Sequence, residues 1–134
     1  KWFVPEPLSG QADRLLDGAR DLLAPDLIFP ELGNVLWKKV ARRELSPAEA
    51  RDVLSGLQRV PLVVEPSRAL TAAALEIALV HGRTVYDAVY VALAVAHDCT
   101  LVTADDRLVR TLAVGPLARH VRSLAALEPS PGGG

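Results

Sequence analysis

Residues 86–105 read YDAVYVALAVAHDCTLVTAD, and this stretch decides the fold. From Tyr86 to His97 the residues are apolar on almost every side, which is typical of a helix buried between neighbouring elements. Thr100 to Thr103 then predicts a short buried strand. A helix rises about 1.5 Å per residue and a strand about 3.3 Å, so the strand can return along the length of the helix. We therefore expect Asp87 and Asp105 at the same end of this unit.

Short apolar strands and longer helices alternate along the rest of the chain. Proline and glycine mark several boundaries, and Ser46 with Glu49 forms a capping-box pattern that begins a helix. This alternation predicts an α/β protein, a three-layer α/β/α sandwich with a mainly parallel central sheet. The other expected helices cover about residues 10–23, 31–43, 46–59, 67–82 and 106–113, and the other expected strands cover 27–29 and 60–65.

Size and composition favour one domain. The chain has 134 residues, of which 50% are hydrophobic, enough to form a core without disulfides. We expect a single domain over residues 1–127 and a disordered Pro/Gly-rich tail over 128–134. Cys99 is the sole cysteine, no stretch reaches the roughly 20 apolar residues of a membrane span, and the first residues lack the apolar core of a signal peptide. A soluble cytoplasmic protein is therefore expected, and its formal net charge of −1 does not by itself indicate nucleic-acid binding.

Three acidic residues are expected to converge. Glu31 opens the helix after the strand of 27–29, Asp87 opens the apolar helix, and Asp105 follows the strand that this helix precedes. In parallel α/β units, helix N-termini lie near the carboxyl ends of the strands, where ligands bind. Clustered carboxylates repel one another unless a cation is bound, and oxygen ligands suit Mg²⁺ or Mn²⁺.

Helix capping is the alternative interpretation of these acids. Glu31 and Asp87 are favoured at helix N-termini by the helix dipole, and Asp105 can cap the helix that follows it. The alternative weakens for the three together, because Asp87 precedes a nearly all-apolar helix in which an acid is poorly hydrated.

Three segments resemble the acidic motifs of PIN-domain ribonucleases, particularly VapC-type toxins of type II toxin–antitoxin systems. They are LIFPELGNVLW at 27–37, VYDAVYVALA at 85–94 and LVTADDRL at 101–108. The resemblance covers nearly the whole chain. It implies a Mg²⁺- or Mn²⁺-dependent endoribonuclease that leaves 5′-phosphate and 3′-hydroxyl ends. It also implies inhibition by a cognate VapB-type antitoxin and a homodimer.

The resemblance assigns roles to individual residues. Asp87 and Asp105 correspond to metal ligands, and Glu31 to a ligand or a water-orienting carboxylate. Thr103 and Asn34 would give nearby polar support. Just beyond Asp105, Arg107 and Arg110 are candidate RNA contacts, with pairing to surface acids as the simpler alternative. Asp106 is expected to begin the next helix.

One departure from the family pattern keeps other functions open. The family places its first catalytic aspartate at the end of a central first strand, just upstream of the segment that begins here at Lys1, so we expect a fourth carboxylate there. Without it, a catalytically degenerate PIN-like module that binds protein or RNA is the alternative. A receiver-type phosphoacceptor domain is less favoured because it needs a lysine after a late strand, and the only lysines are Lys1, Lys38 and Lys39.

Overall fold

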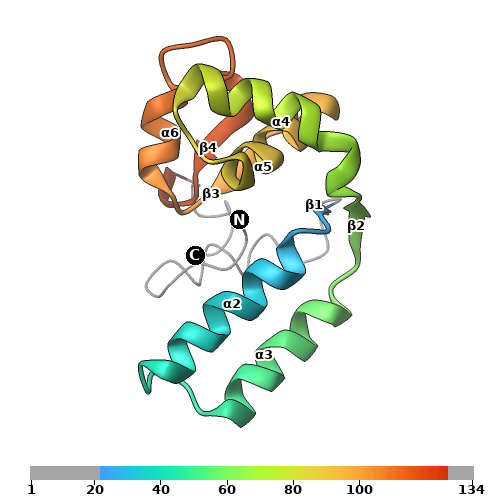
Figure 1. Cartoon of the computed structure of the whole chain (residues 1–134), viewed down its shortest axis with the longest axis vertical. Helices are drawn as coiled ribbons and strands as arrows, with labels where there is room; N and C mark the ends of the chain where they lie inside the picture. Colours follow the sequence, from blue (N-terminus) through green and yellow to red (C-terminus); the bar gives the residue numbers. More distant parts are fainter. Residues whose placement is uncertain (1–21, 127–134) are drawn as a thin grey trace, which may run out of the picture.

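The computed structural model of the chain describes residues 22–126 (Figure 1). The predicted tail of 128–134 and most of the predicted helix of 10–23 lie outside these residues. The last part of that helix prediction is wrong, because strand β1 begins at Leu22 and ends at Pro25. Among the described helices, none is both long and apolar enough to cross a membrane.

The strands form two parallel pairs. Strand β1 (Leu22–Pro25) pairs with β2 (Leu62–Glu65), and β3 (Leu101–Thr103) pairs with β4 (Val121–Ser123). The α/β class with parallel strands is thereby confirmed. One central sheet was expected from the sequence. The described residues hold two separate two-stranded sheets instead, because no strand within 22–126 joins the two pairs. Strand β4 was not predicted, since it has only one apolar residue, Val121.

Two helices form a hairpin that projects from the β1–β2 pair (Figure 1). They are α2 (Ile28–Ala41) and α3 (Pro47–Arg59), which pack through buried leucines of both helices, Leu32, Leu36 and Leu57. The predicted capping box is confirmed, because the Glu49 backbone N–H donates to Ser46 Oγ at 3.1 Å and the Ser46 backbone N–H donates to Glu49 Oε1 at 3.0 Å.

The predicted strand of 27–29 is wrong. Leu27 is the N-cap of α2, and Ile28 already belongs to this helix. The apolar character of Ile28 has another cause, since its side chain is buried on the inner face of the helix. A short apolar run can form a strand or the first turn of a buried helix, and here the strand had ended before it.

Helix α5 (Val85–Ala96) lies at the centre of the second part of the molecule, and every residue from Asp87 to Ala94 is buried. On one side Leu70 and Ala74 of α4 (Ser67–His81) pack against it. On the other side Val91 contacts buried residues of α6 (Asp106–Leu112) and β4, namely Leu108, Leu112 and Val121. Short 3₁₀ turns at Ala118–His120 and Leu124–Ala126 flank β4. The prediction of a helix surrounded by neighbours is confirmed.

The link between α4 and α5 positions Arg83 and Asp87. Gly82 ends α4 in the left-handed conformation, with φ of 66°. Thr84 then begins α5, because its side-chain oxygen accepts a hydrogen bond from the Asp87 backbone N–H at 3.1 Å. Arg83 lies between these two capping residues, outside either helix.

Candidate active site

One guanidinium group bridges Asp87 and Asp105. Arg83 Nη2 lies 3.0 Å from Asp87 Oδ2 and 2.8 Å from Asp105 Oδ2. The side chains of Arg83 and Asp87 are only 15% and 12% exposed, whereas that of Asp105 is 32% exposed. The structure therefore brings the N-terminus of α5 and Asp105, two residues after β3, to one point, where the Arg83 guanidinium supplies a positive charge.

Asp105 is fixed by three contacts. Its Oδ1 accepts a hydrogen bond from the Leu108 backbone N–H at 3.0 Å, which caps α6. Its backbone N–H donates to Thr103 Oγ1 at 3.0 Å, and Thr103 is almost fully buried at the end of β3. The capping interpretation therefore describes one carboxylate oxygen of Asp105, while the other oxygen faces Arg83.

Asp87 also combines two explanations. It lies in the first turn of α5, where the helix dipole favours an anion, and its backbone N–H is bound by Thr84. Its carboxylate pairs with Arg83. Two part-buried carboxylates this close repel each other unless a cation lies between them, and Arg83 supplies that cation here.

Glu31 reaches the same region through Tyr90. Glu31 lies in the first turn of α2, and its Oε1 accepts a hydrogen bond of 2.6 Å from the Tyr90 hydroxyl. Tyr90 follows Asp87 by three residues on α5, so both side chains lie on one face of that helix. Burial raises the pKa of Tyr90 far above its usual value, and the hydrogen bond and charge of Glu31 and the charge of Asp87 raise it further. The hydroxyl therefore stays protonated and donates to Glu31.

The donor atoms fit a hard divalent cation, although the set is only partly assembled. Asp87 and Asp105 offer carboxylate oxygens close to one point, which is the chemistry that Mg²⁺ and Mn²⁺ prefer. Within residues 22–126, no group of three histidine, cysteine, aspartate or glutamate side chains is arranged to hold a metal ion. Glu31 is connected to this region by the hydrogen bond from the Tyr90 hydroxyl.

The other predicted residues lie around this cluster. Asn34 follows Glu31 on α2 and is exposed. Arg107 and Arg110 are exposed on α6, and within the described part of the chain neither guanidinium forms an ion pair, so the pairing with surface acids is not observed there. Asp106 begins α6 as expected, and the Ser123 hydroxyl donates to it at 2.6 Å.

Two residues of the cluster were missed from the sequence. Neither Arg83 nor Tyr90 is among the site residues expected from the sequence, because that expectation rests on the carboxylates. A usable signal existed for Tyr90, since a tyrosine in an almost wholly apolar helix needs a partner for its hydroxyl. The signal for Arg83 is its position four residues before Asp87, which brings the two side chains together across the α5 N-cap.

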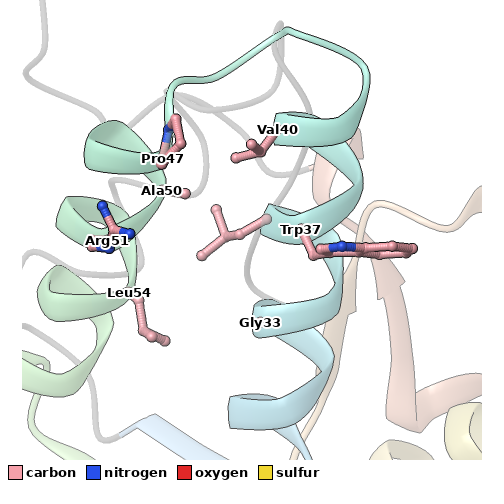
Figure 2. A pocket seen from close by; sticks show the side chains of 8 residues that line it. Gly33, Trp37, Val40, Pro47, Ala50, Arg51 and Leu54 are labelled. Carbon is pink, nitrogen blue, oxygen red and sulfur yellow. The ribbon is translucent and has the colours of Figure 1, made fainter.

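A shallow groove of about 260 Å³ lies elsewhere, between α2 and α3 (Figure 2). It is lined by apolar side chains apart from Arg51, and Figure 2 shows Val40 projecting from α2 toward α3. No carboxylate lines it. The groove therefore takes no part in the acidic cluster.

Known proteins share this sequence pattern. The PIN domain profile matches residues 1–113. Ribonuclease VapC3 of Pyrobaculum aerophilum is 40% identical over 108 residues, which cover 79% of this chain and 82% of that protein. VapC ribonuclease Mb0985 of Mycobacterium bovis is 37% identical over 99 residues, covering 74% and 76%. Ribonuclease VapC1 of Mycobacterium tuberculosis is 38% identical over 87 residues, covering 63% of each chain. This chain therefore belongs to the PIN-domain family and, within it, to the VapC-type ribonucleases.

Proposed function

We propose that this protein is a toxin-type endoribonuclease that hydrolyses phosphodiester bonds in RNA with Mg²⁺ or Mn²⁺. The observation that carries the proposal is the convergence of Asp87 and Asp105 on one cationic position, at 3.0 Å and 2.8 Å from the same nitrogen. Similarity to proteins named as ribonucleases supports the reaction class. The carboxylate chemistry supports the choice of metal.

The carboxylates have distinct tasks in this proposal. Asp87 and Asp105 would hold the divalent cation, which would supply an activated water and neutralise charge on the phosphate. The Leu108 N–H keeps the Asp105 carboxylate oriented. Glu31, held by the Tyr90 hydroxyl, would be a further ligand or would orient the water. The water oxygen bonds to phosphorus as the bond to the 3′-oxygen breaks, and the proton passes to that oxygen. The products carry 5′-phosphate and 3′-hydroxyl ends.

RNA binding is assigned to side chains beside the acids. Arg107 and Arg110 lie within the first two turns after Asp105 and are exposed, so they can neutralise RNA phosphates near the reacting bond. The Thr103 hydroxyl supports Asp105 by accepting a hydrogen bond from the Asp105 backbone N–H. Asn34, exposed on α2 three residues after Glu31, would give further polar support to the site. Because the net charge of the chain is −1, this local charge has to attract the RNA.

The proposed partners are an antitoxin and a second copy of this chain, and the proposed compartment is the cytoplasm. A VapB-type antitoxin would inhibit the enzyme by covering the acidic cluster, since a protein segment there excludes RNA. A homodimer in the cytoplasm is the expected state. Names of the relatives support the toxin class.

Cleavage of end-labelled RNA by the full-length protein tests the function. We expect cutting with Mn²⁺ or Mg²⁺, no cutting with EDTA, and product ends that a 5′-phosphate-dependent exonuclease can degrade. RNA that is bound but never cut in any divalent metal would favour the degenerate binding module instead.

A further inference from the structure

We infer that Arg83 is an internal counter-cation of the acidic site, which holds Asp87 and Asp105 together in the metal-free protein and exchanges with the divalent cation. The inference rests on the proposed metal binding at these two carboxylates. It does not depend on RNA being the substrate. Arg83 is accordingly a positioning residue, acting through the two acids.

One nitrogen atom of Arg83 contacts both carboxylates. Arg83 Nη2 lies 3.0 Å from Asp87 Oδ2 and 2.8 Å from Asp105 Oδ2. A Mg²⁺ ion binds carboxylate oxygens at about 2.0–2.1 Å. A cation that bound the same two oxygens would compete with this nitrogen for them, and its positive charge would repel the guanidinium. Arg83 would then release at least one carboxylate.

The hydrogen bonds that hold the Arg83 side chain are few in the described part of the chain. A structural arginine–carboxylate pair usually uses two parallel hydrogen bonds from two nitrogens. Here a single nitrogen serves both acids, and within the described residues the buried Nε has no hydrogen-bond partner. An unsatisfied buried donor weakens the arrangement. The hydrogen bonds from Arg83 to the two carboxylates can therefore break when another cation binds.

The backbone around Arg83 forms a short link between α4 and α5. Arg83 follows the left-handed Gly82 and precedes Thr84, which caps α5 through the Asp87 N–H. The side chain of Arg83 thus leaves from a short link that belongs to neither helix. Its movement away from the acids breaks no helical hydrogen bond, so exchange with a metal ion leaves α4 and α5 intact.

Electrostatics then predicts a coupled effect of removing the charge. Without the guanidinium, the two part-buried carboxylates lose the positive charge that they share, which destabilises the metal-free protein. The same change removes a competitor for the carboxylates, so a divalent cation binds more tightly. Because binding to the folded state adds to stability, the two effects are linked in one thermodynamic cycle.

Variants at two arginines test the inference. Arg83→Gln removes the bridging charge, and Arg119→Gln removes a matched surface arginine, which pairs with Asp98 at 3.0 Å where both side chains are more than two-thirds exposed. Mn²⁺ affinity is measured by calorimetry, and Tm is measured in EDTA and in saturating Mn²⁺. For Arg83→Gln we expect about ten-fold tighter Mn²⁺ binding, a lower Tm in EDTA and a smaller Tm deficit in Mn²⁺. Arg119→Gln should match the wild type.

A measurement on the wild-type protein guards against a variant that does not fold. The Arg83 Nε–Hε resonance, identified by its loss in Arg83→Lys, should shift as Mg²⁺ is titrated, while that of Arg119 stays fixed. Unchanged or weaker Mn²⁺ binding by folded Arg83→Gln, or an Arg83 resonance that ignores bound Mg²⁺, overturns the inference. If Arg83→Gln binds Mn²⁺ more tightly but the wild type cuts no RNA, the inference stands and the proposed function fails. If the wild type binds no Mn²⁺, the inference is wrong.

Discussion

Arg83 Nη2 lies 2.8 Å from Asp105 Oδ2, although the two residues are 22 positions apart in the sequence. One residue precedes α5 and the other precedes α6, so this contact connects the starts of two helices. It also places a permanent positive charge at the point where the carboxylates of the site meet. The same point is where the proposed cation would bind.

Tyr90→Phe should lower the rate of RNA cleavage strongly and the free energy of unfolding only slightly. The change deletes the hydroxyl that donates to Glu31 at 2.6 Å and leaves the ring in the core. Loss of a hydrogen bond that orients a metal-site carboxylate typically lowers activity by about 10–100-fold, so we expect kcat to fall about ten-fold. The free energy of unfolding should fall by about 1 kcal/mol. Rates of RNA cleavage and urea denaturation measure the two effects.

Tyr86→Phe is the matched control for that change. Tyr86 lies on the same helix but is 64% exposed, so loss of its hydroxyl should alter neither quantity. Equal losses of activity in both variants would show that the Tyr90–Glu31 contact does not position the glutamate.

Gly82→Ala should destabilise the protein through its backbone. Gly82 has φ of 66°, and a Cβ there would meet no atom within 4 Å, so the cost is conformational and about 1 kcal/mol. Gly56→Ala in α3 makes the same chemical change inside a helix with equal space, and should stabilise by about 0.5–1 kcal/mol. Urea denaturation of both variants measures these opposite signs. A stabilising Gly82→Ala would contradict the left-handed turn before Arg83.

Acid stability should depend in part on Asp26. Its carboxylate accepts hydrogen bonds from the Ser67 hydroxyl and from the Ser67 backbone N–H at 3.0 Å, and these hold the pKa of Asp26 below its usual value of 3.8. A depressed folded pKa stabilises the fold above the unfolded value, and this contribution is lost as the pH falls below about 3.8. Denaturation curves between pH 5 and about pH 2 should therefore show a shallower loss of stability for Asp26→Asn than for the wild type.

The control for this acid effect is Asp52→Asn on α3, where the carboxylate is exposed. Its stability should follow the wild-type pH dependence. If Asp26→Asn and Asp52→Asn behave alike, the link between β1 and the start of α4 does not contribute.

The strongest predictions from the sequence came from long or strongly marked segments. Helix α5 was predictable because an apolar surface on every side has only one stable location, between other elements. The start of α3 was predictable because Ser46 and Glu49 satisfy two backbone donors in a local pattern. Both signals lie within a few residues of sequence, so no knowledge of distant contacts was needed.

Weaker predictions failed where distant packing decides. Ile28 was assigned to a strand, yet its apolar side chain serves the buried face of α2. Arg83 was missed because its role depends on the left-handed Gly82 and on Asp105, which is distant in sequence. The spacing of acidic residues predicts the negative charges of a site but not the positive charge that compensates them.

The dependence of RNA cleavage rate on Mn²⁺ concentration tests the central claim, that Asp87 and Asp105 hold the cation on which cleavage depends. The wild type should show saturable activation, and Asp87→Asn and Asp105→Asn should each cut about 100-fold more slowly or require far more Mn²⁺. Asp52→Asn, an exposed aspartate on α3, should follow the wild-type curve. If both site variants cut RNA as fast as the wild type at every Mn²⁺ concentration, Asp87 and Asp105 are not the metal site.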